Sequence, residues 1–230
     1  WRLPTVKELS TLVDAGIAHP GPTIDIDYFP HCKGSWYWSS SSESDPGLAG
    51  NAWYVRFSNG YLSHAEKVGY KYVRAVRAGH PGYFEHSFVV GDGTVTDTGT
   101  GLMWQQATME GTFTWEGALS ACENLVLGGH RDWRLPNRNE LLSLVDYSAY
   151  NPSIDAGVFS DTVSDRYWTS SPYATDSGEA WAIRFDSGAL TTLKVFKAFG
   201  VGNLYRVRAV RTAQGGPAKA LPSVIMLLLD

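Results

Sequence analysis

The amino-acid sequence predicts an α+β fold that occurs twice in one chain of 230 residues. The first observation is a repeated phrase: WRLPTVKELSTLVD at 1–14 returns as WRLPNRNELLSLVD at 133–146, with nine of fourteen residues identical. The second is a helix start signal inside that phrase. The third is a set of short segments after it, whose apolar residues alternate as they do in strands. Together these observations predict a tandem duplication of one unit of helices and antiparallel strands.

Further blocks repeat in the same order, as expected of a duplication. They are IDIDYFP and IDAGVFS, YWSSS and YWTSS, AWYVRFSNG and AWAIRFDSG, and YVRAVR and RVRAVR. Two copies of so long a unit predict paired globular domains rather than a solenoid, which needs at least three short repeats. The predicted domains are a first repeat at 1–79, a linker at 80–87, a complete second repeat at 88–212 and a tail at 213–230.

The second repeat opens with a predicted β-hairpin and a helix. TVTD (94–97) and LMWQ (102–105) alternate in polarity, and the TGTG between them supplies turn residues. A helix is expected over 114–129, because Thr114 suits an N-cap and the glycine pair at 128–129 suits the end of a helix. The apolar face of this helix consists of Trp115, Leu119, Cys122 and Leu125.

A second helix follows the WRLP phrase in each copy. Asn137 with Glu140, and Thr5 with Glu8, have the spacing of a capping box, in which each side chain bonds the backbone N–H of the other residue. Apolar residues at i, i+3 and i+4 then face a core. They are Leu141, Leu144 and Val145 in the second copy, and Leu9, Leu12 and Val13 in the first.

The remaining matched blocks predict strands. YWSSS and AWYVRF are rich in the aromatic and β-branched residues that strands prefer, as are their counterparts. YVRAVR (72–77) alternates with period 2 and carries apolar residues on both faces, which predicts a partly covered strand.

The first copy has no counterpart of the opening hairpin and helix, so we expect it to leave core surface and strand edges uncovered. The simplest explanation is a sequence that begins downstream of this segment. The gap could be filled by the apolar tail VIMLLLD (224–230), by the other repeat or by a partner chain. Six consecutive apolar residues fall far short of the roughly 20 that span a bilayer, so we expect no membrane span.

Composition narrows the classes of function that the protein can have. Only 18% of residues are charged while 13% are aromatic, which is typical of an extracellular or periplasmic domain, and a net charge of -4 argues against nucleic acid as a partner. The six histidines form no metal-binding motif and the serines form no nucleophile elbow, so we expect neither an enzyme nor a cofactor. GDGTVTD (91–97), with Asp92 and Asp97, predicts a turn rather than a calcium loop.

Residues that recur in both copies are expected to have structural roles in the core of each repeat. The matched tryptophans are predicted as core rather than as a sugar-stacking platform; they are Trp38, Trp53, Trp168 and Trp181. The matched arginines are predicted to form structural pairs rather than to bind a ligand. They are Arg2, Arg134, Arg74 and Arg208, with Asp14, Asp146, Glu8 and Glu140 as candidate partners. Cys32 and Cys122 either form one disulfide or stay buried as thiols.

The string GDGTVTDTGTGLMWQ, followed by ACENL, DWRLPNRNELLSLVD, YWTSS and YRVRAVR, resembles the C-terminal domain family of the collagen-like bacterial adhesin, the Lcl C-terminal domain. The second copy matches over about 88–211 and the first from WRLP onward. The resemblance implies a C-type-lectin-like fold, of the variety also seen in formylglycine-generating enzymes. It further implies secreted or surface-exposed bacterial proteins, some of which bind sulfated polysaccharides. The sequence lacks the EPN, QPD and WND triplets of calcium-dependent lectins and the cysteine pair of the enzymes.

Segments in which the two copies differ are the candidates for binding, because a rigid scaffold displays its variable contacts on loops. They mix aromatic and cationic side chains. The candidate residues are Tyr61, His64, Lys67, Tyr70, Lys71, Tyr173, Lys194, Phe196, Lys197 and Phe199. Solvated loops or an inter-repeat contact are the other interpretations of these segments.

The sequence therefore predicts a non-enzymatic binding or adhesion module, which recognises a glycan or protein ligand through variable loops. The predicted location is the bacterial cell surface, the medium or the periplasm. The alternative is a structural subunit of an extracellular assembly, in which the tail or the incomplete first repeat makes contacts by strand addition.

Overall fold

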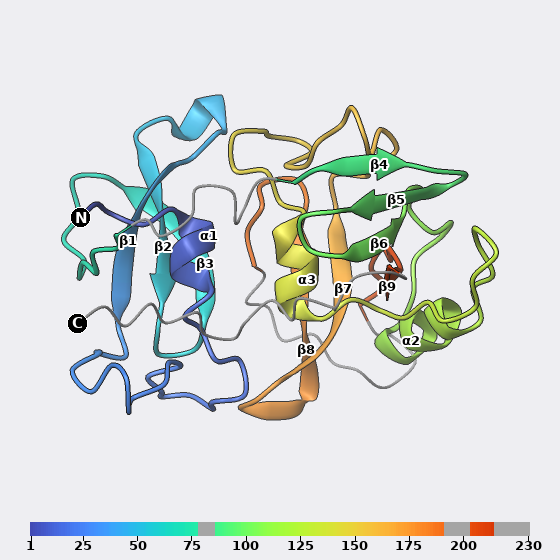
Figure 1. Ribbon diagram of the computed structural model, residues 1–230. Coiled ribbons are helices and arrows are strands. Elements are labelled where there is room, and N and C mark those ends of the chain that lie inside the picture. Colours follow the sequence, from blue (N-terminus) through green and yellow to red (C-terminus); the bar gives the residue numbers. More distant parts are fainter. Residues whose placement is uncertain (78–85, 191–202, 214–230) are drawn as a thin grey trace. The chain divides into compact units, whose positions relative to one another are not determined.

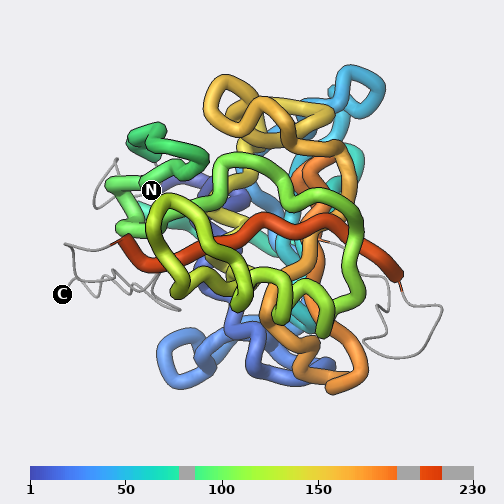
Figure 2. Tube along the Cα trace, turned by 90° about the vertical axis from the view of Figure 1, so that its right-hand side faces the viewer, coloured from blue at the N-terminus to red at the C-terminus, as the bar shows by residue number. Residues whose placement is uncertain are grey.

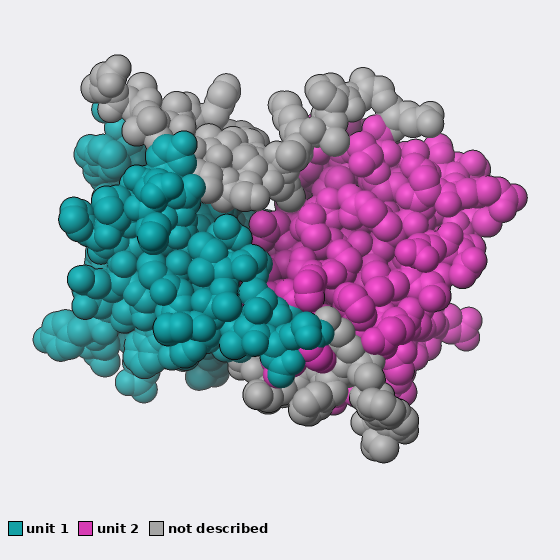
Figure 3. Space-filling view, turned by 90° about the horizontal axis from the view of Figure 1, so that it is seen from below, with its two compact units in different colours: residues 1–83, 173–177, 222–230 teal, residues 84–172, 178–221 magenta. Residues whose placement is uncertain are grey.

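The computed structural model describes residues 1–77, 86–190 and 203–213. These residues form two compact units (Figure 3). Unit 1 holds the described residues 1–77 and 173–177, and unit 2 holds 86–172, 178–190 and 203–213. The predicted binding residues Lys194, Phe196, Lys197 and Phe199 lie outside the described residues, as does the VIMLLLD tail.

Unit 1 is an antiparallel sheet with one short helix (Figure 1). Its strands are β1 (Trp36–Ser42), β2 (Asn51–Arg56) and β3 (Tyr61–Glu66), in the order β1-β2-β3. Helix α1 (Val6–Ser10) packs on β1 and β2, and a 3-10 turn, η1 (Pro46–Leu48), precedes β2.

Unit 2 contains two antiparallel sheets and two helices. The first sheet has the order β4-β5-β6-β9, from β4 (Phe88–Val90), β5 (Thr94–Asp97), β6 (Leu102–Gln105) and β9 (Val210–Thr212). The second pairs β7 (Arg166–Tyr173) with β8 (Asp176–Arg184), apart from residues 173–177, which belong to unit 1. The helices are α2 (Trp115–Glu123) and α3 (Arg138–Ser143). The predicted hairpin is confirmed as β5 and β6, and the predicted α+β class is confirmed by these elements.

Both capping boxes are confirmed. The Thr5 hydroxyl accepts from the Glu8 N–H at 3.2 Å, and the Asn137 carbonyl oxygen accepts from the Glu140 N–H at 2.9 Å. Each glutamate accepts in return from the backbone N–H of its cap residue, at 2.8 Å in both copies. The helix that follows WRLP therefore begins with the same pair of hydrogen bonds in both copies.

The end predicted for the helix over 114–129 is wrong. Thr114 caps α2 as predicted, but the helix stops at Glu123, where Asn124 forms the C-cap and its amide donates to the Ser120 carbonyl at 2.8 Å. The two glycines instead form a tight turn, with φ of 59° at Gly128 and 78° at Gly129. Their positive φ values close a two-residue loop between Leu127 and His130, whose backbones pair.

The strand predicted over YVRAVR forms only in part. In unit 1, this segment makes single bridges from Tyr72 to Tyr37 and from Val76 to Arg2. In unit 2, the equivalent segment 205–211 runs into β9 and lies beside the stretch 101–113, which supplies its neighbour (Figure 2). Among the described residues of unit 1, no segment pairs with 72–77 in the way that 101–113 pairs with 205–211.

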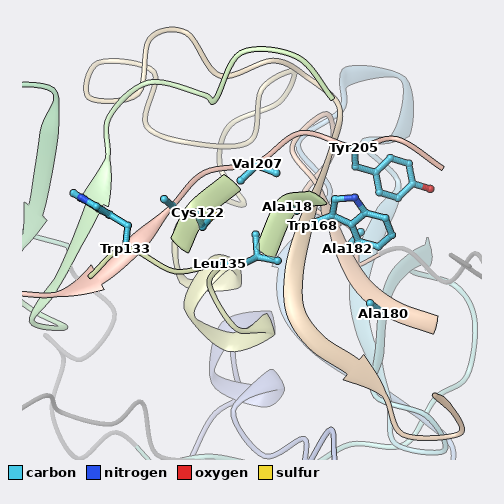
Figure 4. Close-up of a cluster of buried hydrophobic side chains, with 10 residues drawn as sticks. Ala118, Cys122, Trp133, Leu135, Trp168, Ala180, Ala182, Tyr205 and Val207 are labelled. Atoms are coloured by element: carbon cyan, nitrogen blue, oxygen red, sulfur yellow. The ribbon is translucent and has the colours of Figure 1, made fainter. Parts of the chain in front are cut away.

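The core of unit 2 lies where α2 meets the β7–β8 sheet and the segment 205–209 (Figure 4). Ala118 and Cys122 of α2 are fully buried there, beside Trp133 and Trp168. The core prediction is confirmed for Trp53, Trp168 and Trp181, which are all buried, but it is wrong for Trp38, which is half-buried.

The matched arginines and the cysteines have structural partners or buried positions. Arg2 pairs with Glu8 at 2.5 Å and Arg134 with Glu140 at 2.7 Å, which confirms the prediction for these two arginines. Arg208 instead lies 3.7 Å from Asp161, which was not among the predicted partners. Cys32 and Cys122 are both buried free thiols, so the structure has the thiol alternative and not the disulfide. Burial raises the pKa of the Cys122 thiol to about 12.

Candidate functional site

The outward face of the β1–β2 pair carries an aromatic stripe. Trp38 lies opposite Tyr54 in the ladder, and Trp36 lies opposite Arg56. Since side chains alternate along a strand, Trp36, Trp38 and Tyr54 share one face. The intervening residues Tyr37 and Val55 point to the other face and are buried. One face of this sheet therefore belongs to the core, and the other carries the aromatic rings of the stripe.

The ammonium group of Lys71 lies among these rings. Its Nζ is 4.1 Å from the ring centroid of Trp38, 4.7 Å from that of Tyr54 and 5.3 Å from that of Trp36. Each contact is of the cation–π kind, which contributes about 0.5–1 kcal/mol at an exposed site. Partial burial among the rings lowers the pKa of Lys71. We call Trp36, Trp38, Tyr54 and Lys71 the Lys71 cluster.

The Lys71 cluster is open to solvent. The Trp36 side chain is 44% exposed, and Trp38 and Tyr54 are half-buried. Ring centroids lie 5.9 Å apart for Trp36 and Tyr54 and 6.2 Å apart for Trp38 and Tyr54, so the rings support one another. The guanidinium of Arg56 lies 5.9 Å from the Trp36 ring and adds a second cation. The surface is thus aromatic and cationic, although the whole chain is acidic.

The equivalent face of unit 2 is closed. Trp168, the counterpart of Trp38, is fully buried, and its Nε1 donates to the Phe113 carbonyl at 2.8 Å. In unit 1, Trp38 Nε1 donates instead to the Gly69 carbonyl at 3.2 Å. The other three positions differ in kind between the copies. Arg166, Ala182 and Tyr205 stand where the Lys71 cluster has Trp36, Tyr54 and Lys71.

Of the predicted binding residues that the structure describes, only Lys71 joins this cluster. Tyr70 is fully exposed, and Lys67 reaches the Ala49 carbonyl at 3.4 Å. Tyr61 stacks on Tyr173 within unit 1, with ring centroids 6.1 Å apart. Tyr61 and Tyr173, two further predicted binding residues, are thus in contact with each other, but this contact is separate from the Lys71 cluster.

His64 points to the buried face of the sheet and not to the outward one. Its ring packs edge-on against Trp53 at 5.4 Å, and its Nδ1 accepts from the Asn51 amide at 3.1 Å. The remaining ring nitrogen, Nε2, faces the Glu43 carboxylate at 3.9 Å. This arrangement gives His64 a structural position behind the aromatic face.

The GDGTVTD stretch forms a turn, as predicted, in which the Gly91 N–H donates to the Thr94 carbonyl at 2.8 Å. Asp97 is buried and bonds His86 at 2.6 Å and the Gly99 N–H at 2.9 Å. Within the described ranges, no three His, Cys, Asp or Glu residues lie close enough together to hold a metal ion.

Sequence reasoning missed Trp36 and Tyr54. The signal was present in the comparison of the copies: Tyr54 lies inside a matched strand block and Trp36 directly precedes one, yet the second copy has alanine and arginine at these positions. Exposed rings that gather on one face, where the second copy has small or polar residues, mark a candidate interaction surface.

The fold and this surface define a class of protein: a duplicated α+β module with one closed and one open aromatic face. The chain belongs to the Lcl C-terminal domain family, whose model matches residues 1–77 and 93–211. The two matched stretches confirm the resemblance and the two copies, the first matched from Trp1 onward. The family consists of domains associated with bacterial surfaces and adhesins.

Neither the curated proteins nor the solved structures contain a match to this chain. Among the described residues, no helix is long and apolar enough to cross a membrane.

Proposed function

We propose that this chain is a non-enzymatic binding module of a bacterial surface or secreted protein, and that the Lys71 cluster binds a glycan. Each unit is proposed to have a C-type-lectin-like scaffold, as the family resemblance implies. The observation that carries the proposal is the open aromatic face of unit 1, which has no equivalent in unit 2.

The chemistry of the Lys71 cluster suits a sugar ring. The flat, apolar face of a pyranose packs on an exposed indole, and Trp36 presents such a face with 44% of its surface exposed. Lys71 and Arg56 lie beside that ring and offer donors to hydroxyl groups or to sulfate and carboxylate substituents. The rings are held by two paired strands, so little conformational freedom is lost on binding.

The residues at the equivalent positions of unit 2 define the substitutions that test this proposal. Trp36→Arg and Tyr54→Ala give unit 1 the residues that the second copy already accommodates in its matched strands. Binding to a printed array of sulfated and neutral oligosaccharides is expected to fall at least tenfold in the double variant, because each stacking contact contributes roughly 1 kcal/mol.

Tyr28→Ala is the matched control, because Tyr28 is an exposed ring of unit 1 outside the cluster. Its binding is expected to equal that of the unchanged chain. An array without signal, or a double variant that binds as well as the control, would contradict the proposal.

A further inference from the structure

The three rings of the Lys71 cluster form an aromatic cage that already holds a cation. The ammonium nitrogen of Lys71 lies within 5.3 Å of the ring centroids of Trp36, Trp38 and Tyr54. Within the described part of the chain, this ammonium has no carboxylate or carbonyl partner. The rings, rather than a counter-ion, therefore hold the charge. We call Trp36, Trp38 and Tyr54 the cage.

The walls of the cage are fixed, and its occupant is not. Trp36 and Trp38 belong to β1 and Tyr54 to β2, and these strands pair with Trp38 opposite Tyr54. The Trp38 Nε1 also donates to the Gly69 carbonyl at 3.2 Å, which fixes the indole within unit 1. Lys71 lies outside the strands and reaches the cage with a flexible four-carbon side chain. The rings can therefore stay in place when the ammonium moves away.

A primary ammonium is not the cation that best suits such a cage. The lysine ammonium is compact and strongly hydrated, and desolvation lowers the pKa of Lys71 in this position. A trimethylammonium group carries the same charge but has no N–H groups to hydrate, and its methyl groups pack on the faces of the rings. A quaternary ammonium thus loses less hydration in the cage than the ammonium of Lys71 does.

A second cation lies beside the cage without a counter-ion. The guanidinium of Arg56 is 5.9 Å from the ring centroid of Trp36. It forms no ion pair with any residue that the structure describes. A guanidinium binds phosphate through two parallel N–H···O bonds. A phosphate that is attached to the quaternary ammonium would therefore find a partner next to the cage.

We propose that the cage binds the trimethylammonium group of a phosphocholine substituent, that Lys71 leaves the cage on binding, and that Arg56 pairs with the phosphate. This inference rests on the proposed function, because it names a substituent that the ligand of the Lys71 cluster carries. Unit 2 has Arg166, Ala182 and Tyr205 at the equivalent positions, so one such site is expected per chain. The same chemical group can be carried by a glycan or by a lipid.

The first test compares three small ligands by isothermal titration calorimetry on the full chain. Phosphocholine is expected to bind saturably. Phosphoethanolamine is expected to bind about tenfold more weakly, because its primary ammonium is strongly hydrated. Choline, which lacks the phosphate, is expected to bind about fivefold more weakly than phosphocholine. Absence of phosphocholine binding, or equal binding of phosphocholine and phosphoethanolamine, would overturn the proposal.

Protein variants separate the roles of the residues. Lys71→Gln removes the tethered cation and is expected to strengthen choline binding about fivefold, whereas Tyr54→Ala removes one wall and is expected to weaken it about fivefold. Arg56→Gln is expected to weaken phosphocholine binding and to leave choline binding unchanged. Lys67→Gln is the matched control, because the Lys67 ammonium reaches the Ala49 carbonyl at 3.4 Å instead of the cage. A Lys71→Gln variant that binds choline no better than this control would contradict the displacement of Lys71.

The carrier of the phosphocholine is identified with two larger probes. They are a neutral oligosaccharide with and without a phosphocholine substituent, and vesicles of phosphatidylcholine. Binding to either phosphocholine-bearing probe supports the assigned chemistry. Binding to the vesicles with no binding to any glycan would contradict the proposed glycan function alone. Binding to unsubstituted glycans without any binding of phosphocholine would contradict this inference alone.

Discussion

At the scale of single residues, the two copies act as controls for one another. Trp1 and Trp133 are the same residue in the same phrase, yet one is 85% exposed and the other 2%. Arg74 and Arg208 lie over equivalent phenylalanines, and only Arg208 has carbonyl acceptors among the residues that the structure describes. Identity of the residue therefore predicted its position on the scaffold but not its burial, which depends on the segments that pack around it.

The His86–Asp97 pair of unit 2 offers a pH-dependent prediction. His86 donates Nδ1–H to Asp97 at 2.6 Å, and its Nε2 lies 2.7 Å from the Ser143 carbonyl, so both ring nitrogens face acceptors. Burial opposes the ionisation of Asp97, but the bond and charge of His86 outweigh it and hold the pKa of Asp97 below its ordinary value. Asp97→Asn is expected to lower the free energy of unfolding of unit 2 by about 3 kcal/mol at pH 7.

This difference is expected to shrink in acid. A carboxyl group with a lowered folded-state pKa stabilises the fold above its unfolded pKa, near 3.9, and loses that contribution as pH falls through the folded value. Urea unfolding followed by circular dichroism between pH 7 and pH 2 measures it. Asp92→Asn, at an exposed position of the same loop, serves as the control. A difference that stays constant over this range would contradict the assigned role.

At the scale of elements, helix starts were predictable and helix ends were not. The caps Thr5, Thr114 and Asn137 each accept the bond that the sequence pattern predicts, because capping is local chemistry. The end of α2 was misplaced because Gly128 and Gly129 suit a helix terminus and a tight hairpin turn equally well. The YVRAVR segment likewise has strand character, but strand pairing requires a neighbour that lies far away in the sequence.

The capping box of α3 gives a prediction at this scale. Helix α3 spans only six residues, so its stability depends on its caps and packing rather than on propensity. Asn137→Ala removes the acceptor of the Glu140 N–H and is expected to lower the free energy of unfolding by about 1 kcal/mol. Asn137→Ser keeps an acceptor and is expected to cost well under half of that. Equal losses in chemical denaturation of the two variants would show that the cap bond contributes little.

At the scale of the whole molecule, the duplication and the α+β class could be read from repeated blocks, because matched patterns imply matched folding units. The site could be read only in part. Lys71 was selected because the copies differ around it, whereas Trp38 was predicted as core because it recurs in both copies, and Trp36 was not singled out. Their exposure depends on which segments pack over the sheet, which is a tertiary property. Predictions on Lys194, Phe196, Lys197 and Phe199 remain predictions.

The central claim is that one scaffold occurs twice, closed in unit 2 and open in unit 1. Tryptophan modification by a water-soluble oxidant, mapped by peptide mass spectrometry on the native chain, tests this claim most directly. Trp36, on the open face of unit 1, is expected to react rapidly, while the buried Trp133 and Trp168 of unit 2 are expected to stay unmodified until the protein unfolds. Equal reactivity of Trp36 and Trp133, or rapid modification of Trp168 in the folded chain, would contradict the account.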